Sequence, residues 1–346
     1  MDLKGKRILV AQTAYIGDVV LTWPLLWRSH VISGQQVGLL TRPQCALLFE
    51  AAQDIVEIIP FDKRGQDKGL SGLLRVAKSL NGRFDIALSP HPSFRTSLFL
   101  KLAKIPIRIG FSNAQCSFLY STQVAWDNRR HEVERQKLLL EAVAKAAANI
   151  NDVPPIPASS AQKRRADELL KAAGVKEGKV LVAINPFSVW YTKRWPLGNW
   201  AKLAEFVEDK IDARVLVVGG ASDANEADRL KKQSRAELLS LVGQTDLGVL
   251  NALMERISIF VSNDSGPAHV AAMQKVPTIV IFGSTTPELG YVPRGPNVDV
   301  VQIDLNCRPC GRHGHKRCPE VHFKCMKDIT PEMVINAVLK QLAKNK

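Results

Sequence analysis

The segment Phe260-Val-Ser-Asn-Asp-Ser-Gly-Pro-Ala-His269 connects a strand pattern to a helix pattern and indicates the fold class of the chain. The apolar run from Ile257 to Val261 predicts a buried strand, and Val270-Ala-Ala-Met273 continues the helix. A strand that passes through a short polar turn into a helix is the repeating unit of α/β proteins.

The polar turn in this segment has the features of an anion-binding helix start. Ser265 is placed to cap the helix, and Pro267 suits its first turn. Because free backbone N–H groups and the helix dipole favour negative charge at this position, the turn predicts a phosphate site. Asp264 and His269 lie beside it in the sequence and would orient a sugar or a phosphate.

The same alternation of short apolar runs and amphipathic stretches extends through the chain. In the first half the predicted strands are Arg7–Gln12, Val37–Thr41, Val56–Phe61, Asp85–Pro90 and Ile107–Phe111. In the second half they are Val180–Pro186, Arg214–Gly220, Leu238–Gly243, Ile257–Asp264, Thr278–Gly283 and Val298–Asp304. Helical patterns such as Trp200–Lys210 and Ala224–Ser234 lie between them, so we expect βαβ units and parallel sheets.

The alternation is interrupted once, by a long helical stretch (His131–Asn149) and the Pro-rich segment Asp152-Val-Pro-Pro-Ile-Pro157. We interpret the Pro-rich segment as a linker. A chain of 346 residues is expected to form two domains of roughly 150 residues each. We therefore predict tandem Rossmann-like domains at 1–155 and 156–330, followed by a C-terminal helix at 331–346. The sequence leaves open whether that helix packs back on the first domain.

The net charge of +14 calls for anionic partners. Nucleic acid, a phosphorylated small molecule and an anionic membrane surface all satisfy this condition, and so does a plain Lys-rich surface without a partner. Nucleic acid is disfavoured because aromatic residues make up only 6% of the chain and the basic residues are scattered. The apolar runs are shorter than the roughly 18 residues of a spanning helix, and the N-terminus lacks a secretory pattern, so we expect a cytoplasmic protein.

The turn after the first predicted strand is Ala11-Gln-Thr-Ala-Tyr-Ile-Gly-Asp18. It lacks the full G-x-G-x-x-G pattern, which argues against a dinucleotide site. Gly17 permits close approach of the backbone to a ligand, and Asp18 is either a general base or a helix N-cap. Because a helix dipole weakens a carboxylate as a base, a catalytic Asp18 needs an apolar wall or a closing domain beside it.

The turn Asn185-Pro-Phe-Ser-Val-Trp-Tyr-Thr-Lys-Arg-Trp-Pro196 combines hydroxyl groups with cations. Ser188, Thr192 and Lys193 suit a diphosphate, with Lys193 as a point charge for a leaving group. The alternative is a surface loop anchored by its tryptophans. The turn Gly219–Glu226 carries Asp223 and Glu226, either of which would hold ribose hydroxyls, although an ordinary βα turn has the same pattern. The turn Phe282–Glu288 adds hydroxyl groups, with capping of the next short helix as the alternative.

The last four cysteines are compactly spaced at Cys307, Cys310, Cys318 and Cys325. Four thiols at this spacing suit structural zinc, and the basic residues at 312–317 would stabilise thiolates. A reduced cluster, or bridges formed during purification, remain alternatives, because a cytosolic setting disfavours permanent disulfides. Catalytic zinc is disfavoured because four thiolates leave no open position. We expect Cys45 and Cys116 to be buried structural thiols.

Basic and polar side chains of the first domain form a separate set, several of them after predicted strand ends. The cations that would bind an anionic acceptor are Lys63, Arg64, Arg95 and Arg108. Each of them alone is also typical of solvated surface.

The ordered set of these turns resembles glycosyltransferase family 9, the lipopolysaccharide heptosyltransferases. In the first half the resemblance is carried by Tyr15-Ile-Gly-Asp-Val-Val-Leu-Thr-Trp-Pro24, Ser93-Phe-Arg95, Arg108-Ile-Gly110 and His131-Glu-Val-Glu134. In the second half it is carried by Thr192-Lys-Arg-Trp-Pro196, Asn263-Asp-Ser-Gly-Pro-Ala-His269 and Phe282-Gly-Ser-Thr-Thr-Pro287. The cysteine-rich tail with Cys325-Met-Lys-Asp-Ile-Thr-Pro331 is most similar to the heptosyltransferase II group.

The resemblance implies a GT-B fold, in which two Rossmann-like domains face each other across a cleft. It implies an inverting, metal-independent transfer of heptose from ADP-heptose, bound by the second domain, to a phosphorylated lipid A–Kdo–heptose acceptor, bound by the first. The enzyme would work at the inner face of the inner membrane.

The resemblance also implies roles for particular residues. Asp18 corresponds to the proposed base, and Lys193 would stabilise the departing ADP. The implied donor-binding residues are Ser188, Thr192, Asp264, Ser265, Gly266, His269 and Thr285. Two departures weaken the donor assignment: Ala224 stands where some relatives have Glu, and Ser284-Thr285-Thr286 replaces the commoner Pro-Thr-Asp. A family member using another nucleotide sugar, and a non-catalytic sugar-nucleotide binding protein, therefore remain alternatives.

Overall fold

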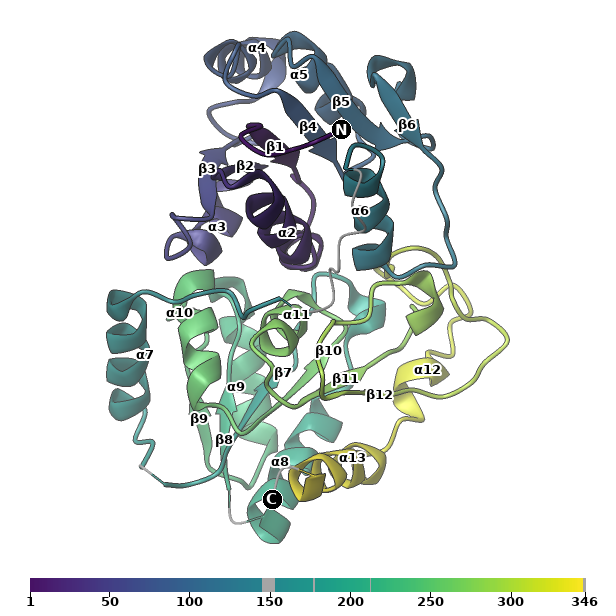
Figure 1. Cartoon of the computed structure of the whole chain (residues 1–346). Coiled ribbons are helices and arrows are strands. Elements are labelled where there is room, and N and C mark those ends of the chain that lie inside the picture. Colours follow the sequence, from purple (N-terminus) through teal and green to yellow (C-terminus); the bar gives the residue numbers. More distant parts are fainter. Residues whose placement is uncertain (145–152, 177, 212, 345–346) are drawn as a thin grey trace. The chain divides into compact units, whose positions relative to one another are not determined.

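The computed structural model describes residues 1–144, 153–176, 178–211 and 213–344. The chain divides into two compact units, Met1–Pro157 and Ala158–Lys346, at the end of the Pro-rich segment (Figure 1). The predicted helix His131–Asn149 begins as expected, and α6 spans Glu132–Glu141. Its predicted last residues, 145–149, and Asp152 of the predicted linker lie outside the described residues.

The first unit contains a six-stranded, all-parallel sheet in the order β3-β2-β1-β4-β5-β6. Its strands are β1 (Ile8–Ala11), β2 (Val37–Thr41), β3 (Val56–Pro60), β4 (Ile86–Ser89), β5 (Ile107–Phe111) and β6 (Thr122–Val124). Its helices are α1 (Ile16–Val20), α2 (Trp23–Ser33), α3 (Pro43–Ala46), η1 (Leu47–Phe49), α4 (Gly69–Ser79), α5 (Phe94–Leu102), η2 (Ser117–Leu119) and α6. The short edge strand β6 was not predicted, because Thr-Gln-Val is largely exposed and forms no apolar run.

The core of the first unit depends on close packing between strands and helices. Every residue of β1 and β2 is buried, as is typical of parallel strands covered on both faces. A Cβ atom at Gly38 would lie 2.5 Å from the ring of Phe84, so only glycine fits at this point of β2. Phe61 and Phe99 pack with ring centroids 5.6 Å apart in a buried cluster that includes residues of the same sheet.

The second unit repeats this architecture with the order β12-β11-β10-β7-β8-β9, again all parallel. Its strands are β7 (Leu181–Asn185), β8 (Arg214–Val217), β9 (Leu238–Ser240), β10 (Ile259–Asn263), β11 (Thr278–Ile281) and β12 (Val298–Val301). Its longer helices are α7 (Ser160–Ala172), α8 (Leu197–Ile211), α9 (Ala224–Gln233), α10 (Leu247–Leu253), α11 (Gly266–Met273) and α13 (Pro331–Lys344). Shorter helical turns are η3 (Tyr191–Lys193), η4 (Ala221–Asp223), η5 (Met254–Arg256), η6 (Pro287–Leu289) and α12 (Lys324–Lys327).

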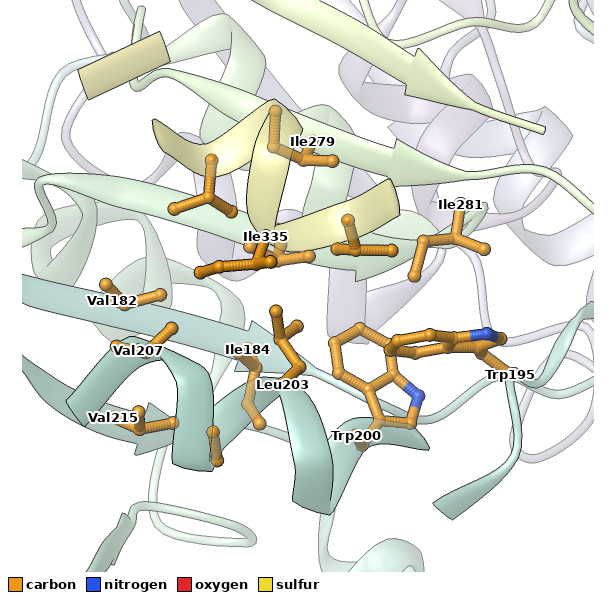
Figure 2. Close-up of a cluster of buried hydrophobic side chains, with 14 of the residues drawn as sticks. Val182, Ile184, Trp195, Trp200, Leu203, Val207, Val215, Ile279, Ile281 and Ile335 are labelled. Carbon is orange, nitrogen blue, oxygen red and sulfur yellow. The ribbon is translucent and has the colours of Figure 1, made fainter. Parts of the chain in front are cut away.

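The C-terminal helix α13 completes the core of the second unit (Figure 2). Ile335 is fully buried beside strand residues such as Ile279 and Ile281. Trp195 and Trp200 pack edge to face in the same cluster, with ring centroids 5.1 Å apart. The sequence left open a packing of α13 on the first domain. The structure instead places its apolar face on α8 and the second sheet, which would otherwise expose their own apolar surface.

Both sheets have the strand order of doubly wound nucleotide-binding folds, so the predicted α/β class is confirmed. In such sheets the order reverses between two neighbouring strands, here β1 and β4 in the first unit and β7 and β10 in the second. Ligands bind beyond the carboxyl ends of strands at that reversal. In the described part of the chain, no helix has the length and apolarity needed to cross a bilayer.

Candidate functional site

In the second unit, the turns that follow β7 and β10 meet at the point where the strand order reverses. Lys193, at the end of η3, and Asp264, directly after β10, form an ion pair with Nζ and Oδ2 2.5 Å apart. The side chains are only 13% and 8% exposed. Thr285 donates its hydroxyl to the same Oδ2 at 2.7 Å. The structure thus brings together one cation, one carboxylate and one hydroxyl group from three predicted turns.

Two buried asparagines hold these turns in register. Asn263 accepts the backbone N–H of Trp195 at 3.0 Å and donates to the carbonyl of Pro186 at 2.7 Å. Asn185 donates to the carbonyl of Val218 at 2.9 Å. Because each amide bridges neighbouring strand ends, the position of Lys193 depends on the sheet itself and not on a free loop.

Ser265 occupies the N-cap position of α11 but does not cap it. Its hydroxyl donates to Asn185 Oδ1 at 3.2 Å and lies 2.9 Å from the hydroxyl of Ser262. The predicted capping role is therefore wrong, because a nearby buried polar group competes for the hydroxyl. Gly266 begins the helix, and His269 is buried within it.

The third predicted turn joins the second through a salt bridge. Arg194 Nη1 lies 2.5 Å from Glu226 Oε1, and Arg194 Nε donates to the carbonyl of Ser188 at 2.6 Å. Asp223 accepts the N–H of Gly220 at 2.8 Å and so stabilises its own turn. Of the two acids considered for ribose, Glu226 is the one that contacts the Ser188–Arg194 turn.

The segment between β12 and α12 forms part of this site, which sequence reasoning missed. Thr192 donates its N–H to the carbonyl of His315 at 3.1 Å, and the N–H of His315 donates to the Thr192 hydroxyl at 2.7 Å. The Thr192 hydroxyl in turn donates to Ser284 at 2.9 Å. The N–H of Cys310 donates to the carbonyl of Ser284 at 2.9 Å. The residues 310–315, which we call the histidine–glycine loop, thus tie two turns of the site together.

The histidine–glycine loop also packs directly against Lys193. The ring of His313 stacks on Trp190 with centroids 6.1 Å apart and an angle of 9°. A Cβ atom at Gly314 would lie 2.5 Å from Trp190 Cβ and 3.1 Å from Lys193 Cγ. Burial, followed by the charges of Lys193 and Arg312, lowers the pKa of His313. The sequence Gly311-Arg-His-Gly-His315 could have indicated that this loop packs against the site, but its basic residues were considered only as stabilising charges beside a metal site.

All six cysteines are free thiols. Burial first, and then the charges of the neighbouring thiols Cys310 and Cys318, raises the pKa of Cys325 to about 11. Over the described ranges, no three His, Cys, Asp or Glu side chains are arranged to hold a metal ion. The arrangement therefore gives no support to the zinc site considered from the spacing. Cys45 is buried as expected, whereas Cys116 is only partly buried.

In the first unit, Asp18 is the third residue of α1 and not its N-cap. Its Oδ2 accepts the N–H of Tyr15 at 3.1 Å, and the side chain is partly buried. Glu132 lies within electrostatic reach, which sequence reasoning missed. Burial raises the pKa of Glu132 to about 7, Arg135 opposes this shift, and the charge of Asp18 adds to it. Asp18 therefore shares its surroundings with a second, more deeply buried carboxyl group.

His91, after β4, meets the first turn at the reversal point of the first sheet. Its Nδ1 lies 3.2 Å from the hydroxyl of Thr13, and Lys63 donates to the carbonyl of Thr13 at 2.8 Å. Burial, and then the charges of Lys63 and Arg42, lowers the pKa of His91 to about 4. The imidazole is consequently neutral at physiological pH and contributes a polar wall without a charge.

The predicted acceptor cations separate into two groups. Burial lowers the pKa of Lys63, and the charges of Arg42, Arg64 and Arg95 lower it further, so these four cations lie close together. Arg42 was not predicted. Arg108 lies apart from this group, near the start of β5, where its guanidinium donates to the carbonyls of Ile105, Pro106 and Leu119.

The family model for glycosyltransferase family 9 (heptosyltransferase) matches residues 73–321, well over half of the chain. The chain therefore belongs to this glycosyltransferase family, as the resemblance predicted. The matched range includes Lys193, Asp264 and Thr285 together with the histidine–glycine loop.

Relatives extend the similarity over nearly the whole chain. The chain is 26% identical to lipooligosaccharide heptosyltransferase 2 of Campylobacter jejuni over 344 residues, 98% of this chain and 99% of the relative. It is similar to the family 9 glycosyltransferase of Veillonella parvula, with a TM-score of 0.86, 26% identity and 99% of each chain covered. It also shares the fold of the E. coli ADP-heptose heptosyltransferase II, with a TM-score of 0.77, 22% identity and 98% and 99% covered. The predicted GT-B fold class is confirmed.

Proposed function

We propose that this enzyme transfers heptose from ADP-heptose to the phosphorylated inner core of lipopolysaccharide, with inversion at the anomeric carbon and without a metal ion. The observation that carries the proposal is the buried Lys193–Asp264 pair at the strand-order reversal of the second sheet. In folds of this class, the phosphates of a bound nucleotide lie beyond the carboxyl ends of the strands at which the strand order reverses. The names of the Campylobacter and E. coli relatives supply the sugar and the acceptor class.

The second unit would bind the donor. Lys193 would neutralise the charge that builds on the β-phosphate as its bond to the sugar breaks, and Thr192 and Ser188 supply hydroxyl groups beside it. The first backbone N–H groups of α11, which Ser265 does not cap, face the same end of the sheet. Fixed donors aimed at developing charge often supply the largest part of a rate enhancement.

The first unit would bind the acceptor. Lys63, Arg64, Arg95 and Arg42 form a cationic group suited to core phosphates. Asp18 would take the proton of the acceptor hydroxyl. The oxygen then forms a bond to the anomeric carbon, and the electron pair of the broken bond leaves with ADP. We place this reaction at the cytoplasmic face of the inner membrane, where such acceptors are anchored.

The test is transfer from ADP-heptose to core acceptors of defined length, followed by mass spectrometry, with the wild type and Asp18→Asn. An Asn oxygen still accepts the N–H of Tyr15, so α1 keeps its shape. We expect Asp18→Asn to lower turnover by about 10²–10⁴-fold, the usual range for a general base. ADP affinity should stay unchanged, because the proposed donor residues belong to the other unit.

Two results would contradict the proposal at different points. Near-native turnover by Asp18→Asn would remove Asp18 as the base while leaving the donor assignment intact. Product formed from another nucleotide sugar, with none from ADP-heptose, would replace the donor while leaving the family unchanged.

A further inference from the structure

We propose that the carboxyl edge of the first sheet docks on an anionic lipid bilayer, with Leu70 and Phe94 inserted among the lipids. This inference rests on the proposed function for the identity of the lipid-anchored acceptor. The docking itself requires neither donor nor acceptor, and it can be measured without them.

The first observation is the position of two exposed apolar side chains. Leu70 is 62% exposed in the first turn of α4, and Phe94 is 44% exposed at the start of α5. The two helices lie side by side (Figure 1), and each begins just beyond the carboxyl end of a strand. Arg95 links the two helix starts, since its Nη2 lies 3.3 Å from the carbonyl of Gly69.

The apolar pattern of α4 explains why Leu70 is exposed. Leu73 and Ala77 are buried on the same face of the helix, at spacings of three and seven residues from Leu70. The stripe therefore continues past the buried residues to Leu70, which is exposed. An apolar stripe that extends into solvent beside cations is typical of a surface that meets a membrane interface.

The second observation is the charge around these side chains. Arg95 Nη1 donates to the carbonyl of Lys63 at 3.4 Å. Burial lowers the pKa of Lys63, and the charges of Arg42, Arg64 and Arg95 lower it further. The acids of this turn are engaged locally: Asp67 pairs with Arg75, and Asp62 accepts the N–H groups of Arg64 and Gly65. Because Arg75 balances Asp67, the four cations around Lys63 outnumber the remaining acid of this turn, Asp62. The resulting positive charge complements anionic headgroups over about one Debye length.

The third observation is the contrast with the opposite edge of the sheet. Phe118 is 74% exposed in η2, close to Leu119, whose carbonyl accepts from Arg108 near the start of β5. The Arg108 guanidinium is committed to backbone carbonyls there. Exposed aromatic surface thus occurs at both edges, and at the carboxyl edge it lies beside the cations around Lys63. A lipid-anchored acceptor must also reach that edge, because Asp18 and His91 lie there.

The experiment is flotation of the full-length protein with vesicles of phosphatidylethanolamine and phosphatidylglycerol, free of acceptor and nucleotide. We expect Leu70→Ser/Phe94→Ser to lower the partition coefficient by about tenfold, from the apolar surface withdrawn from lipid. Phe118→Ser is the matched control and should change it by less than about twofold. Raising the salt concentration should weaken wild-type binding.

Transfer assays complete the test. The double variant should keep wild-type transfer to a water-soluble, delipidated acceptor and lose transfer to an acceptor embedded in vesicles. Wild-type vesicle binding by the double variant, or an equal loss in Phe118→Ser, would overturn the inference. An equal loss of transfer to both acceptors would also overturn it, by showing that the pair contacts acceptor sugars. If vesicle binding depends on Leu70 and Phe94 but no heptose is transferred to any acceptor, the docking surface is supported and the proposed function is refuted.

Discussion

At the scale of single residues, the ion pair between Lys193 and Asp264 is the most informative feature. A buried charge that loses its partner is strongly unfavourable, whereas loss of both charges together costs far less. A diphosphate placed beside this pair is attracted by Lys193 and repelled by Asp264. With a diphosphate in place, the Lys193 ammonium group would therefore have to balance both the Asp264 carboxylate and the phosphates.

This balance predicts the outcome of a double substitution. We expect Lys193→Ala to weaken ADP binding by about 30–100-fold, because Asp264 is left uncompensated next to the phosphates. Lys193→Ala/Asp264→Asn should recover about tenfold of that loss. Isothermal titration calorimetry would measure both, with Lys202→Ala as a control for loss of an exposed lysine. Equal affinities of the single and double variants would show that Asp264 does not oppose the ligand.

His91 predicts a dependence of stability on pH. Its pKa is lowered to about 4 in the folded chain, whereas an unfolded histidine titrates near 6.5. The unfolded state therefore binds more protons between these values, and stability is lost as the pH falls from about 6.5 towards 4. His91→Gln removes this effect. Between pH 8 and pH 5, we expect urea denaturation to show the wild type losing up to about 2 kcal/mol more than the variant. Parallel pH profiles would contradict a buried neutral His91.

At the scale of elements, the histidine–glycine loop shows how a segment without regular structure contributes to a site. It has no strand or helix period, so its pattern gave no prediction beyond the cysteine spacing. Its function as a support follows from backbone bonds to Thr192 and from the missing side chain at Gly314. Gly314 packs directly against Trp190 and Lys193, so a larger residue at this position would have to displace one of these side chains.

We expect Gly314→Ala to lower ADP affinity by about tenfold, because overpacking typically costs 1–3 kcal/mol and here it falls on Trp190 and Lys193. Calorimetric titration with ADP gives the affinity, and the melting temperature reports on the fold. Gly198→Ala is the control: its nearest neighbour would be 3.9 Å away, and Ala favours the helix α8. Unchanged ADP affinity in Gly314→Ala would show that the loop does not position Lys193.

The regular elements were the most predictable part of the chain. β2 and β5 were predicted with the bounds that the structure has, because an apolar run ended by a turn signal is a local property. Other strands were predicted one to three residues too long at their carboxyl ends, as for β12. After several of them, such as β8, the next residue still donates one hydrogen bond to the neighbouring strand, so the end of a strand carries no sharp local signal. β6 was missed since an exposed edge strand carries little pattern.

At the scale of the whole molecule, two units of the same strand order each present polar turns at one edge. The cationic group of the first unit and the Lys193–Asp264 site of the second would divide acceptor and donor between them. The net charge of +14 is a property of the full chain, and the cations around Lys63 form one cluster that would suit a phosphate-rich partner. The helix α13 belongs to the second unit through its apolar face.

The sequence by itself determined the α/β class, most of the strands, the turns that carry Asp18, Lys193 and Asp264, and the resemblance to the family. These are properties of residues close together in the chain. Only the tertiary structure decided which side chains meet. The partners Lys193 and Asp264 are separated by 71 residues, and Thr192 and His315 by 123. Such contacts depend on strand order and on packing between distant segments, which local periodicity does not encode. For the same reason the sequence did not place Arg42 beside Lys63 or the Arg108 guanidinium on backbone carbonyls, and Ser265 donates to Asn185 instead of capping its helix.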